Sequence, residues 1–357
     1  MQLYPPIHGA STVGEIIKAS KLINETFVCD YVRVSTTPIG KGGLFRKIAD
    51  FILLYVKILK LLIKNNYDLV YATPCASGYQ FYKDFGYCII SKLFTKNIAY
   101  HFHNKGISVN KFVPSFIMYV FFKKTKVILS APSLFYDIER YVSKEDVYYC
   151  PYGINDDKHI LTTTISKPLL KPKILFFAHM LREKGVFILL EACKILNEKN
   201  IDFSCNFVGS WYDIKKTEFY SFVELNNLNS KVTFHGPQYG SQKDKFLDEA
   251  DIFAFPTYYK GECFPLGLLE ALRWGLPVIT TFEGAIPDIV DDGISGFIIQ
   301  QKNASSLAEK LEILISNQEL RQEMGLAGRT KYEQKFTLEK FETKLMEILN
   351  QMVIKQQ

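Results

Sequence analysis

The stretch ADIFAFPTYYKGECFPLGLLEALRWG, residues 250–275, decides the fold. It opens with the apolar run Ile252–Phe255, which ends at Pro256 and predicts a parallel β-strand buried on both faces. After a loop, apolar residues recur at helical spacing until Gly275 and Pro277 end the helix. The carboxyl ends of parallel strands face a ligand crevice in open α/β sheets. The stretch therefore predicts an α/β fold with a ligand site at this strand end.

Two glutamates lie eight residues apart in this stretch, and we expect Glu262 at the entrance of the helix and Glu270 about two turns inside it. The N–H groups of the first helical turn, around residues 264–267, attract an anion, and the helix dipole adds to that attraction. Ionised carboxylates only accept hydrogen bonds, so they suit the hydroxyl groups of a sugar or a ribose. The pattern indicates a site for a sugar joined to a phosphate. The alternative is that both glutamates are solvated helix residues.

A second strand and loop lie upstream. The run Lys173–Phe177 predicts a short buried strand, and a helix is expected after Gly185. Arg182 and Lys184 then lie in the loop between them, where cations can clamp a diphosphate and neutralise its charge as it leaves. A solvated basic turn is the alternative. Downstream, a strand at Val278–Thr280 precedes three glycines that predict tight turns beside the same crevice, namely Gly284, Gly293 and Gly296.

Together these motifs resemble the GT-B retaining glycosyltransferases of glycosyltransferase group 1, or family 4. The resemblance runs over essentially the whole chain and is densest from Ala250 to Phe297. Shorter matches are PPIHGAS at 5–11, PYGI at 151–154, REKG at 182–185 and TFHG at 233–236. The family implies two doubly wound Rossmann-like domains that face each other across a cleft. It also implies transfer of a sugar from a nucleotide diphosphate sugar to an acceptor, with retention of the anomeric configuration and usually without a metal.

The resemblance assigns roles to particular residues. Glu262 would hold the donor sugar's hydroxyls, Glu270 the ribose and Lys184 the diphosphate, with Arg182 beside it. His103 would approach the sugar from the amino-terminal half, although a strand-end histidine is often a structural residue. Further donor-binding candidates are Gly9 in the glycine-rich loop, His179, Gly236 near the base, and the backbone of Cys263, Phe264, Pro265, Leu266 and Gly267. We expect His101 on the face of the strand-like run 97–103 opposite to His103.

Two positions depart from the family pattern. Ala178 and His179 stand where many members have Gly-Arg, and Gly9 is followed by Ala10 where the family often has a second glycine. A histidine can be neutral at pH 7, so Arg182 is expected to supply the permanent charge. We predict that Arg182→Ala lowers turnover strongly and that His179→Ala lowers it less.

Length and composition suit two domains, because 357 residues of 48% hydrophobic content can bury two ordinary cores. We expect an acceptor-side domain over 1–155, a polar linker over 156–172 and a donor-binding domain over 173–336. The final segment, 337–357, is expected to return to the first domain, as the resemblance implies. In the first domain, residues 1–4 predict a very short first strand, and clearer strands are predicted at 69–72, 98–102 and 127–129.

Charge is concentrated in the first part of the chain. Residues 1–130 hold 17 Lys and Arg against 6 Asp and Glu. The segments Phe51–Lys64 and Phe112–Lys126 combine apolar and aromatic residues with lysines, which favours contact with an anionic membrane surface. Core helices with solvated lysines are the open alternative. Neither segment is long and uncharged enough to span a bilayer. A nucleic-acid partner is not expected, because no recognised reader motif accompanies the lysines.

The seven cysteines show no paired metal spacing and suit free thiols in a reducing cytoplasm. No cleavable signal is predicted at the start. Cys263 is expected to pack rather than act as a nucleophile. The sequence therefore predicts a cytoplasmic glycosyltransferase at the inner face of the plasma membrane, without a cofactor or metal, that builds a capsule, exopolysaccharide or lipopolysaccharide precursor. A nucleotide-sugar epimerase and a non-catalytic nucleotide-sugar binder remain as alternatives.

Overall fold

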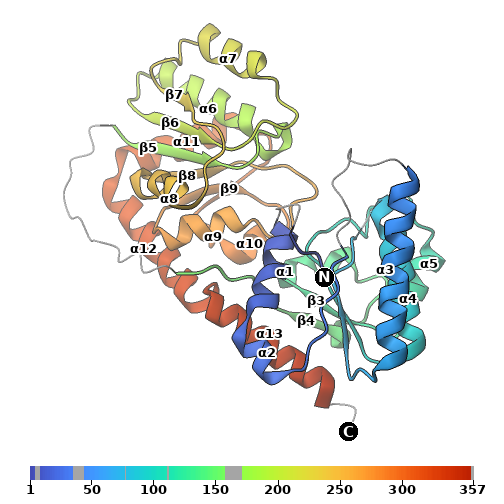
Figure 1. Ribbon diagram of the computed structural model, residues 1–357. Helices are drawn as coiled ribbons and strands as arrows, with labels where there is room; N and C mark the ends of the chain where they lie inside the picture. Colours follow the sequence, from blue (N-terminus) through green and yellow to red (C-terminus); the bar gives the residue numbers. More distant parts are fainter. Residues whose placement is uncertain (5–8, 35–43, 77, 111, 157–170, 355–357) are drawn as a thin grey trace. The chain divides into compact units, whose positions relative to one another are not determined.

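The computed structural model describes residues 1–4, 9–34, 44–76, 78–110, 112–156 and 171–354 (Figure 1). The chain divides into two compact units: a first unit of Met1–Gly153 with Leu338–Gln357, and a second unit of Ile154–Thr337. Most of the predicted linker, part of the PPIHGAS motif and the last three residues lie outside the described residues.

The first unit is built on four described parallel strands in the order β1-β2-β3-β4. Their bounds are β1 (Val70–Ala72), β2 (Ile98–His101), β3 (Lys126–Leu129) and β4 (Val147–Tyr149). Tyr100 on β2 is fully buried and stacks on Phe121 with ring centroids 4.5 Å apart. The helices are α1 (Gly9–Ala19), α2 (Lys21–Thr26), α3 (Leu44–Lys64), α4 (Tyr79–Phe94), α5 (Ser115–Phe122) and α13 (Leu338–Ile354), with short 3-10 turns η1 (Pro132–Asp137) and η2 (Lys144–Asp146).

The helices of the first unit form two groups. The helix α4 packs against α3 and α5, while α13 packs against α2 (Figure 1). The last helix is joined to the sheet region by a buried hydrogen bond, in which Asn97 Nδ2 donates to the Met352 carbonyl at 2.8 Å. Burial of both partners makes this bond costly to break.

The predicted first strand at residues 1–4 is wrong. The Met1 carbonyl accepts a hydrogen bond from the Val34 N–H at 3.0 Å, and the terminal ammonium donates to the Val32 carbonyl at 2.9 Å. Just after β1, the Gln2 N–H donates to the Thr73 hydroxyl at 3.0 Å, and Gln2 Nε2 lies 3.5 Å from Cys75 Sγ. The segment instead pairs with residues 32–34, which begin 31 positions along the chain, and it does not enter the assigned sheet.

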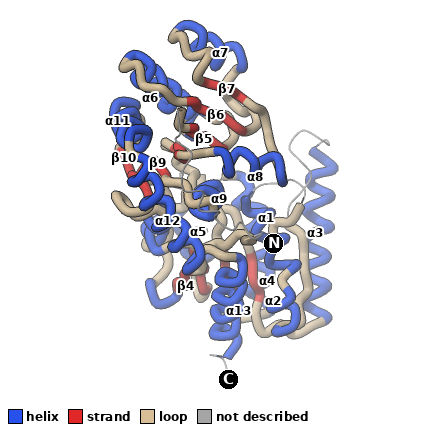
Figure 2. Tube along the Cα trace, turned by 90° about the vertical axis from the view of Figure 1, so that its left-hand side faces the viewer, coloured by secondary structure: helices blue, strands red, loops and turns tan. Residues whose placement is uncertain are grey.

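The second unit contains six described parallel strands in the order β10-β9-β8-β5-β6-β7. Their bounds are β5 (Lys173–Phe177), β6 (Ser204–Val208), β7 (Val232–Phe234), β8 (Ile252–Phe255), β9 (Val278–Thr281) and β10 (Gly296–Ile299). Figure 2 labels β10, β9, β5, β6 and β7 of this sheet. The chain winds outward from β5 to β7 and then in the opposite direction from β8 to β10. The direction therefore reverses between β5 and β8, which is where doubly wound sheets bind ligands.

Helices pack against this second sheet. They are α6 (Val186–Glu198), α7 (Lys216–Leu225), α8 (Gly240–Glu249), α9 (Leu266–Arg273), α10 (Ile286–Ile289), α11 (Ala304–Ser316) and α12 (Gln318–Lys335), with the 3-10 turn η3 (Arg182–Lys184). α6 packs against α11, and α9 packs against α12. The four residues of β8 are all buried, as its continuous apolar run predicts.

One helix boundary differs from the prediction. The helix α9 begins at Leu266, so Glu270 lies one turn inside it and not two. The chain is still extended at Pro265, and the first backbone bond of the helix runs from the Leu268 N–H to the Pro265 carbonyl. Because Pro265 fixes its own φ and carries no N–H, the helix starts immediately after it.

Over the described residues, every helix is either too short or too polar to cross a bilayer.

Candidate functional site

The loops that follow β5 and β8 are in direct contact at the reversal point of the second sheet. Gly185 has a φ of 89°, and a Cβ atom there would lie 2.2 Å from the Pro256 carbonyl oxygen. The Tyr258 N–H donates to the Glu183 carbonyl at 2.7 Å. Only glycine allows both this backbone conformation and this close approach. The two loops are thereby fixed to one another at the strand ends.

The first pair of predicted residues meets in these loops. Lys184 Nζ forms an ion pair with Glu262 Oε2. Both side chains are largely withdrawn from water, with 17% and 8% of their surface exposed. The Lys184 ammonium also lies over the rings of Phe255 and Tyr259, at 5.3 and 5.1 Å from their centroids. A charge pair held against aromatic faces is screened less than a surface pair and keeps its geometry.

The loop after β9 contacts the backbone at Glu262. Gly284, at a φ of 54°, would place a Cβ atom 2.2 Å from the Glu262 carbonyl oxygen. The Ala285 N–H donates to the Cys263 carbonyl at 2.8 Å. Cys263 itself is buried. The loop after β9 therefore sets the path of the backbone that carries Glu262.

The amino end of α9 also lies at this reversal point. A Cβ atom on Gly267 would be 3.6 Å from the Phe177 carbonyl oxygen, at the end of β5. Phe264 is buried and packs edge-on against Phe336, with centroids 6.0 Å apart. The amino end of α9 thus lies beside the end of β5.

Glu270 has a partner that the sequence did not predict. Lys243 Nζ, from α8, forms an ion pair with Glu270 Oε1, and the two side chains are 22% and 17% exposed. The residues are 27 positions apart and belong to different helices. No local spacing relates them, so the tertiary fold brings them together. Each of the two candidate carboxylates is therefore paired with one lysine.

Arg182 and His179 are placed differently. Arg182 forms an ion pair with Glu218 on α7, and this hydrogen bond raises the pKa of the guanidinium. The guanidinium also lies 4.6 Å from the centroid of the Phe187 ring. His179 is exposed, with its ring 6.3 Å from that of Tyr212. In this structure the ion-pair partner of Lys184 is Glu262, and that of Arg182 is Glu218 on α7.

Gly236 lies at the end of β7, with a φ of 72°. Its carbonyl accepts a hydrogen bond from the Gly209 N–H at 3.0 Å. A Cβ atom built on Gly236 would have no described heavy atom within 4 Å, apart from its chain neighbours. This open space beside a strand end is compatible with the predicted place for a flat base.

Gly9 and His103 belong to the first unit, whereas the other candidates belong to the second. Gly9 is the first residue of α1. His103 Nδ1 forms a short hydrogen bond with the Tyr152 hydroxyl, and His101 Nδ1 forms one of 2.6 Å with the Tyr71 hydroxyl. Burial, and secondly the charge of His103, lower the pKa of His101 well below its usual value.

The expectation that the two histidines occupy opposite faces is wrong. Their ring centroids are 4.5 Å apart. In an extended chain, successive side chains point to opposite faces, and residues two apart point to the same face. His101 and His103 are two apart, so their side chains lie on one face. His103 also lies beyond the last residue of β2, which is His101.

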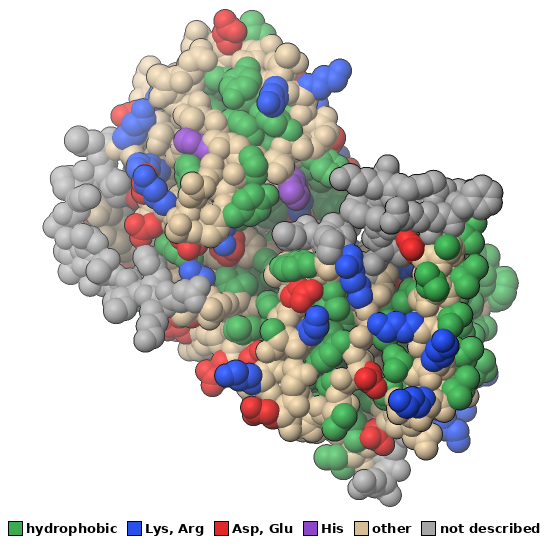
Figure 3. Space-filling model, viewed as in Figure 1, with side chains coloured by type: hydrophobic (Ala, Val, Ile, Leu, Met, Phe, Trp, Pro, Cys, Tyr) green, Lys and Arg blue, Asp and Glu red, His purple; other side chains and the backbone are tan. Residues whose placement is uncertain are grey.

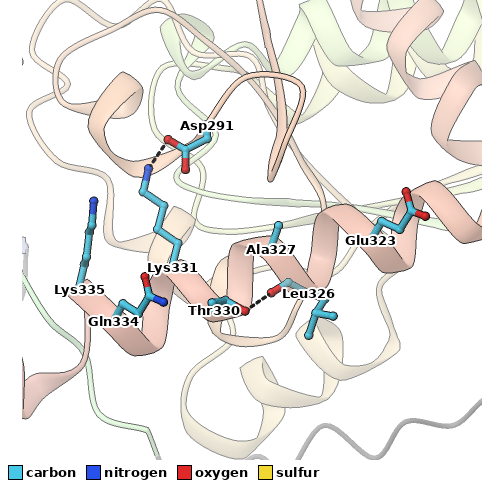
Figure 4. Close-up of a pocket in the computed structure, with 8 residues that line it drawn as sticks. All are labelled: Asp291, Glu323, Leu326, Ala327, Thr330, Lys331, Gln334 and Lys335. Carbon is cyan, nitrogen blue, oxygen red and sulfur yellow. Dashed lines mark hydrogen bonds and ion pairs between the residues drawn. The ribbon is translucent and has the colours of Figure 1, made fainter.

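A separate cavity of about 530 Å³ lies along α12 (Figure 4). It is lined by Asp291, Glu323, Leu326, Ala327, Thr330, Lys331, Gln334 and Lys335. Lys331 points across it to Asp291, with Nζ and Oδ1 2.8 Å apart. None of the predicted site residues lines this cavity. Of its charged residues, Lys331 and Asp291 are paired with each other.

The sequence of the second unit matches a known family. Residues 163–331 match the family model described as glycosyl transferases group 1. Over this stretch the match bears out the resemblance to glycosyltransferase group 1 that the motifs indicated. It is 28% identical over 206 residues to the amylovoran biosynthesis glycosyltransferase AmsK of Erwinia amylovora, an alignment that covers 56% of this chain and 49% of that protein. The chain spans about half the length, or less, of the curated relatives it matches.

Solved structures resemble the whole fold. A glycosyltransferase from Rickettsia africae ESF-5 superposes with a TM-score of 0.74 at 19% identity, covering 99% of this chain and 97% of that one. Anabaena Alr3699/HepE in complex with UDP-glucose gives a TM-score of 0.65 at 16% identity, covering 84% and 82%. At these identities the likeness establishes the fold. The two parallel-sheet α/β units have the fold of the GT-B glycosyltransferases, as the sequence resemblance implied.

Proposed function

We propose that this group 1 glycosyltransferase moves a sugar from a nucleotide diphosphate sugar to a glycan or lipid-linked glycan, with retention of the anomeric configuration. One observation carries the proposal. At the reversal point of the second sheet, two carboxylates on either side of the α9 amino end are each paired with a lysine, Glu262 with Lys184 and Glu270 with Lys243. A sugar nucleotide carries hydroxyl groups at both ends of a diphosphate, and this arrangement offers acceptors at two points, each with a cation beside it.

The chemistry assigned to these residues follows from their charges. Glu262 accepts hydrogen bonds from the donor sugar and Glu270 from the ribose, because ionised carboxylates only accept. Lys184 then turns from its carboxylate partner toward the diphosphate, whose charge grows as the bond to the sugar breaks. Arg182 contributes a second cation if it exchanges Glu218 for the phosphate. Donor binding would thus replace ion pairs within the protein by ion pairs with the ligand.

The step itself is proposed to occur on one face of the sugar. The bond between the anomeric carbon and the diphosphate oxygen breaks, the cationic ring is attacked by the acceptor hydroxyl, and a leaving phosphate oxygen takes that hydroxyl's proton. His103 would hold the sugar from the first unit. We propose that no metal takes part, and a chelator such as EDTA is then expected to leave the transfer rate unchanged.

The pathway proposed is synthesis of a bacterial surface polysaccharide, a capsule, exopolysaccharide or lipopolysaccharide precursor, in the cytoplasm at the inner face of the plasma membrane. The name of AmsK, a protein of amylovoran biosynthesis, supports a polysaccharide product. HepE, a protein of the same fold, was crystallised with UDP-glucose, which supports a nucleotide-sugar donor.

The test is a screen of UDP, GDP, ADP, CMP and dTDP sugars for thermal stabilisation of the protein. A ligand that binds only the folded state raises its melting temperature. We expect one donor to stabilise the wild-type protein and to lose this effect in Glu270→Ala. Glu312→Ala is the matched control, because Glu312 is also paired with a lysine but lies on α11 with 40% of its side chain exposed.

The screen also separates the alternatives. A donor that binds without sugar transfer to any acceptor would favour the non-catalytic binder. Conversion of the bound sugar into its epimer, without an acceptor, would favour the epimerase. If none of these sugars stabilises well-folded protein, the proposed donor site is wrong.

A further inference from the structure

Helix α3 of the first unit exposes an apolar stripe to solvent. The stripe consists of Ile48, Ile52, Val56, Leu59 and Ile63, which are 45%, 57%, 42%, 37% and 68% exposed. Their spacing of three or four residues places them within an arc of about 80° on a helix of 3.6 residues per turn. A stripe of this spacing is usually the face that a helix buries.

The buried face of α3 is a different one. Leu54, Ile58 and Leu62 are each 9% exposed or less, and they follow one another at intervals of four residues. On the same side the Tyr55 hydroxyl donates to the Lys83 carbonyl of α4 at 2.8 Å. Contact with α4 therefore buries only this face of α3, and the apolar stripe stays exposed. The core-helix alternative accounts for only part of the apolar surface of α3.

A row of lysines borders the stripe on its other side. Lys57, Lys60 and Lys64 are all exposed, and the helical period places them within an arc of about 60° next to the stripe. Figure 3 shows basic side chains beside the hydrophobic ones on this helix. Asp50 is the only acidic residue in the 21 residues of α3. Around the helix, the order is thus buried face, exposed apolar stripe and lysine row.

Exposed apolar side chains also occur on α5, which packs against α4 as α3 does. Phe116, Tyr119 and Val120 are 69%, 50% and 48% exposed, and α5 contains no charged residue. Aromatic residues with one polar end are favoured at the boundary between lipid and water.

We infer that the apolar stripe and lysine row of α3 form a docking surface for an anionic lipid bilayer. The stripe would enter the boundary between headgroups and acyl chains, and the lysines would contact anionic headgroups. A second copy of the chain fits less well, because it would bring an equally basic α3 against the same lysines. An acceptor carried on a lipid lies in such a bilayer, and only that link rests on the proposed function.

Two variants test the surface. The lysine variant is Lys57→Gln with Lys60→Gln and Lys64→Gln, and the stripe variant is Ile52→Ser with Val56→Ser and Ile63→Ser. Since all six side chains are exposed, neither variant is expected to unfold the protein. The controls are Leu225→Ser on α7, where Leu225 is 82% exposed, and a triple lysine variant of the second unit, Lys215→Gln, Lys216→Gln and Lys245→Gln.

The measurement is co-sedimentation with phosphatidylcholine vesicles, with and without phosphatidylglycerol, at low and high salt. We expect binding only with phosphatidylglycerol, and weaker binding at high salt. The lysine variant should bind about a hundredfold more weakly, since each lysine near an anionic surface contributes about 1 kcal/mol and 1.4 kcal/mol is tenfold. The stripe variant should lose binding, and both controls should keep it.

Three results would overturn the inference: no binding of the folded wild-type protein, equal binding of wild type and both variants, or a dimer in light scattering that the stripe variant abolishes. Thermal stabilisation by the nucleotide sugar is measured on the same variants. If they respond to the donor as wild type does, a failure of docking leaves the proposed transfer intact, and a failure of the donor screen leaves the docking result standing.

Discussion

Removal of the Glu262 carboxylate should destabilise the second unit through Lys184. In Glu262→Gln the lysine keeps its charge but loses its ion-pair partner, while 83% of its side-chain surface stays covered, since 17% is exposed. Breaking a fully buried pair from one side costs about 3–5 kcal/mol. Because Lys184 retains some contact with water, we expect about 2 kcal/mol.

This free energy is large enough to measure. For a unit of 150–250 residues, 1 kcal/mol shifts the melting temperature by about 2–4 °C, so the expected shift is about 4–8 °C. Adding Lys184→Met to Glu262→Gln gives a double variant in which the uncompensated charge is removed. The double variant should therefore be more stable than the sum of the two single effects predicts, with a coupling free energy of about 1–2 kcal/mol.

Tryptophan fluorescence during urea unfolding is a suitable assay, because both tryptophans of the chain, Trp211 and Trp274, lie in the second unit. The signal therefore reports the unit that carries the ion pair. Donor binding should not recover in the double variant, since the proposed ligand contacts are gone even where the stability has returned.

The exposed pair Lys199 and Glu312 provides the control. Its side chains are 51% and 40% exposed, so removing either charge should cost no more than about 0.5 kcal/mol. If the Lys184–Glu262 cycle gave additive effects within about 0.5 kcal/mol, the two side chains would not interact in solution, and the geometry assigned to the site would be refuted.

Three further predictions concern single residues. Arg182→Ala should lower turnover strongly and His179→Ala less, and equal losses measured with a confirmed donor would contradict this division of roles. Cys263→Ala should retain most activity, because a buried packing residue is replaced by a smaller one; complete loss with intact folding would favour a chemical role. The stability of the first unit should fall as the pH drops below about 6.5, since the unfolded chain then binds a proton that buried His101 resists. Hydrogen exchange of peptides from residues 98–129 should show this loss, at most about 1.4 kcal/mol per pH unit, and His101→Gln should flatten it.

Local sequence was a good guide to the strands of the second unit. β5 and β8 have the bounds predicted from their apolar runs, because a strand buried on both faces leaves a continuous hydrophobic pattern. The first strand predicted at residues 1–4 failed for the converse reason. Four residues carry too little pattern to separate a sheet strand from a segment that only bonds to the distant residues 32–34.

The sequence by itself determined the α/β class, the resemblance to glycosyltransferase group 1 and the residue types at the candidate site, because these depend on local periodicity and on motifs of fixed spacing. Tertiary structure decided which charges are partners. Lys243 reaches Glu270 from another helix, and Arg182 is bound to Glu218 although it is two residues from Lys184. It also decided that the apolar stripe of α3 faces solvent. Pairing and exposure depend on how helices pack, and a linear pattern does not contain that information.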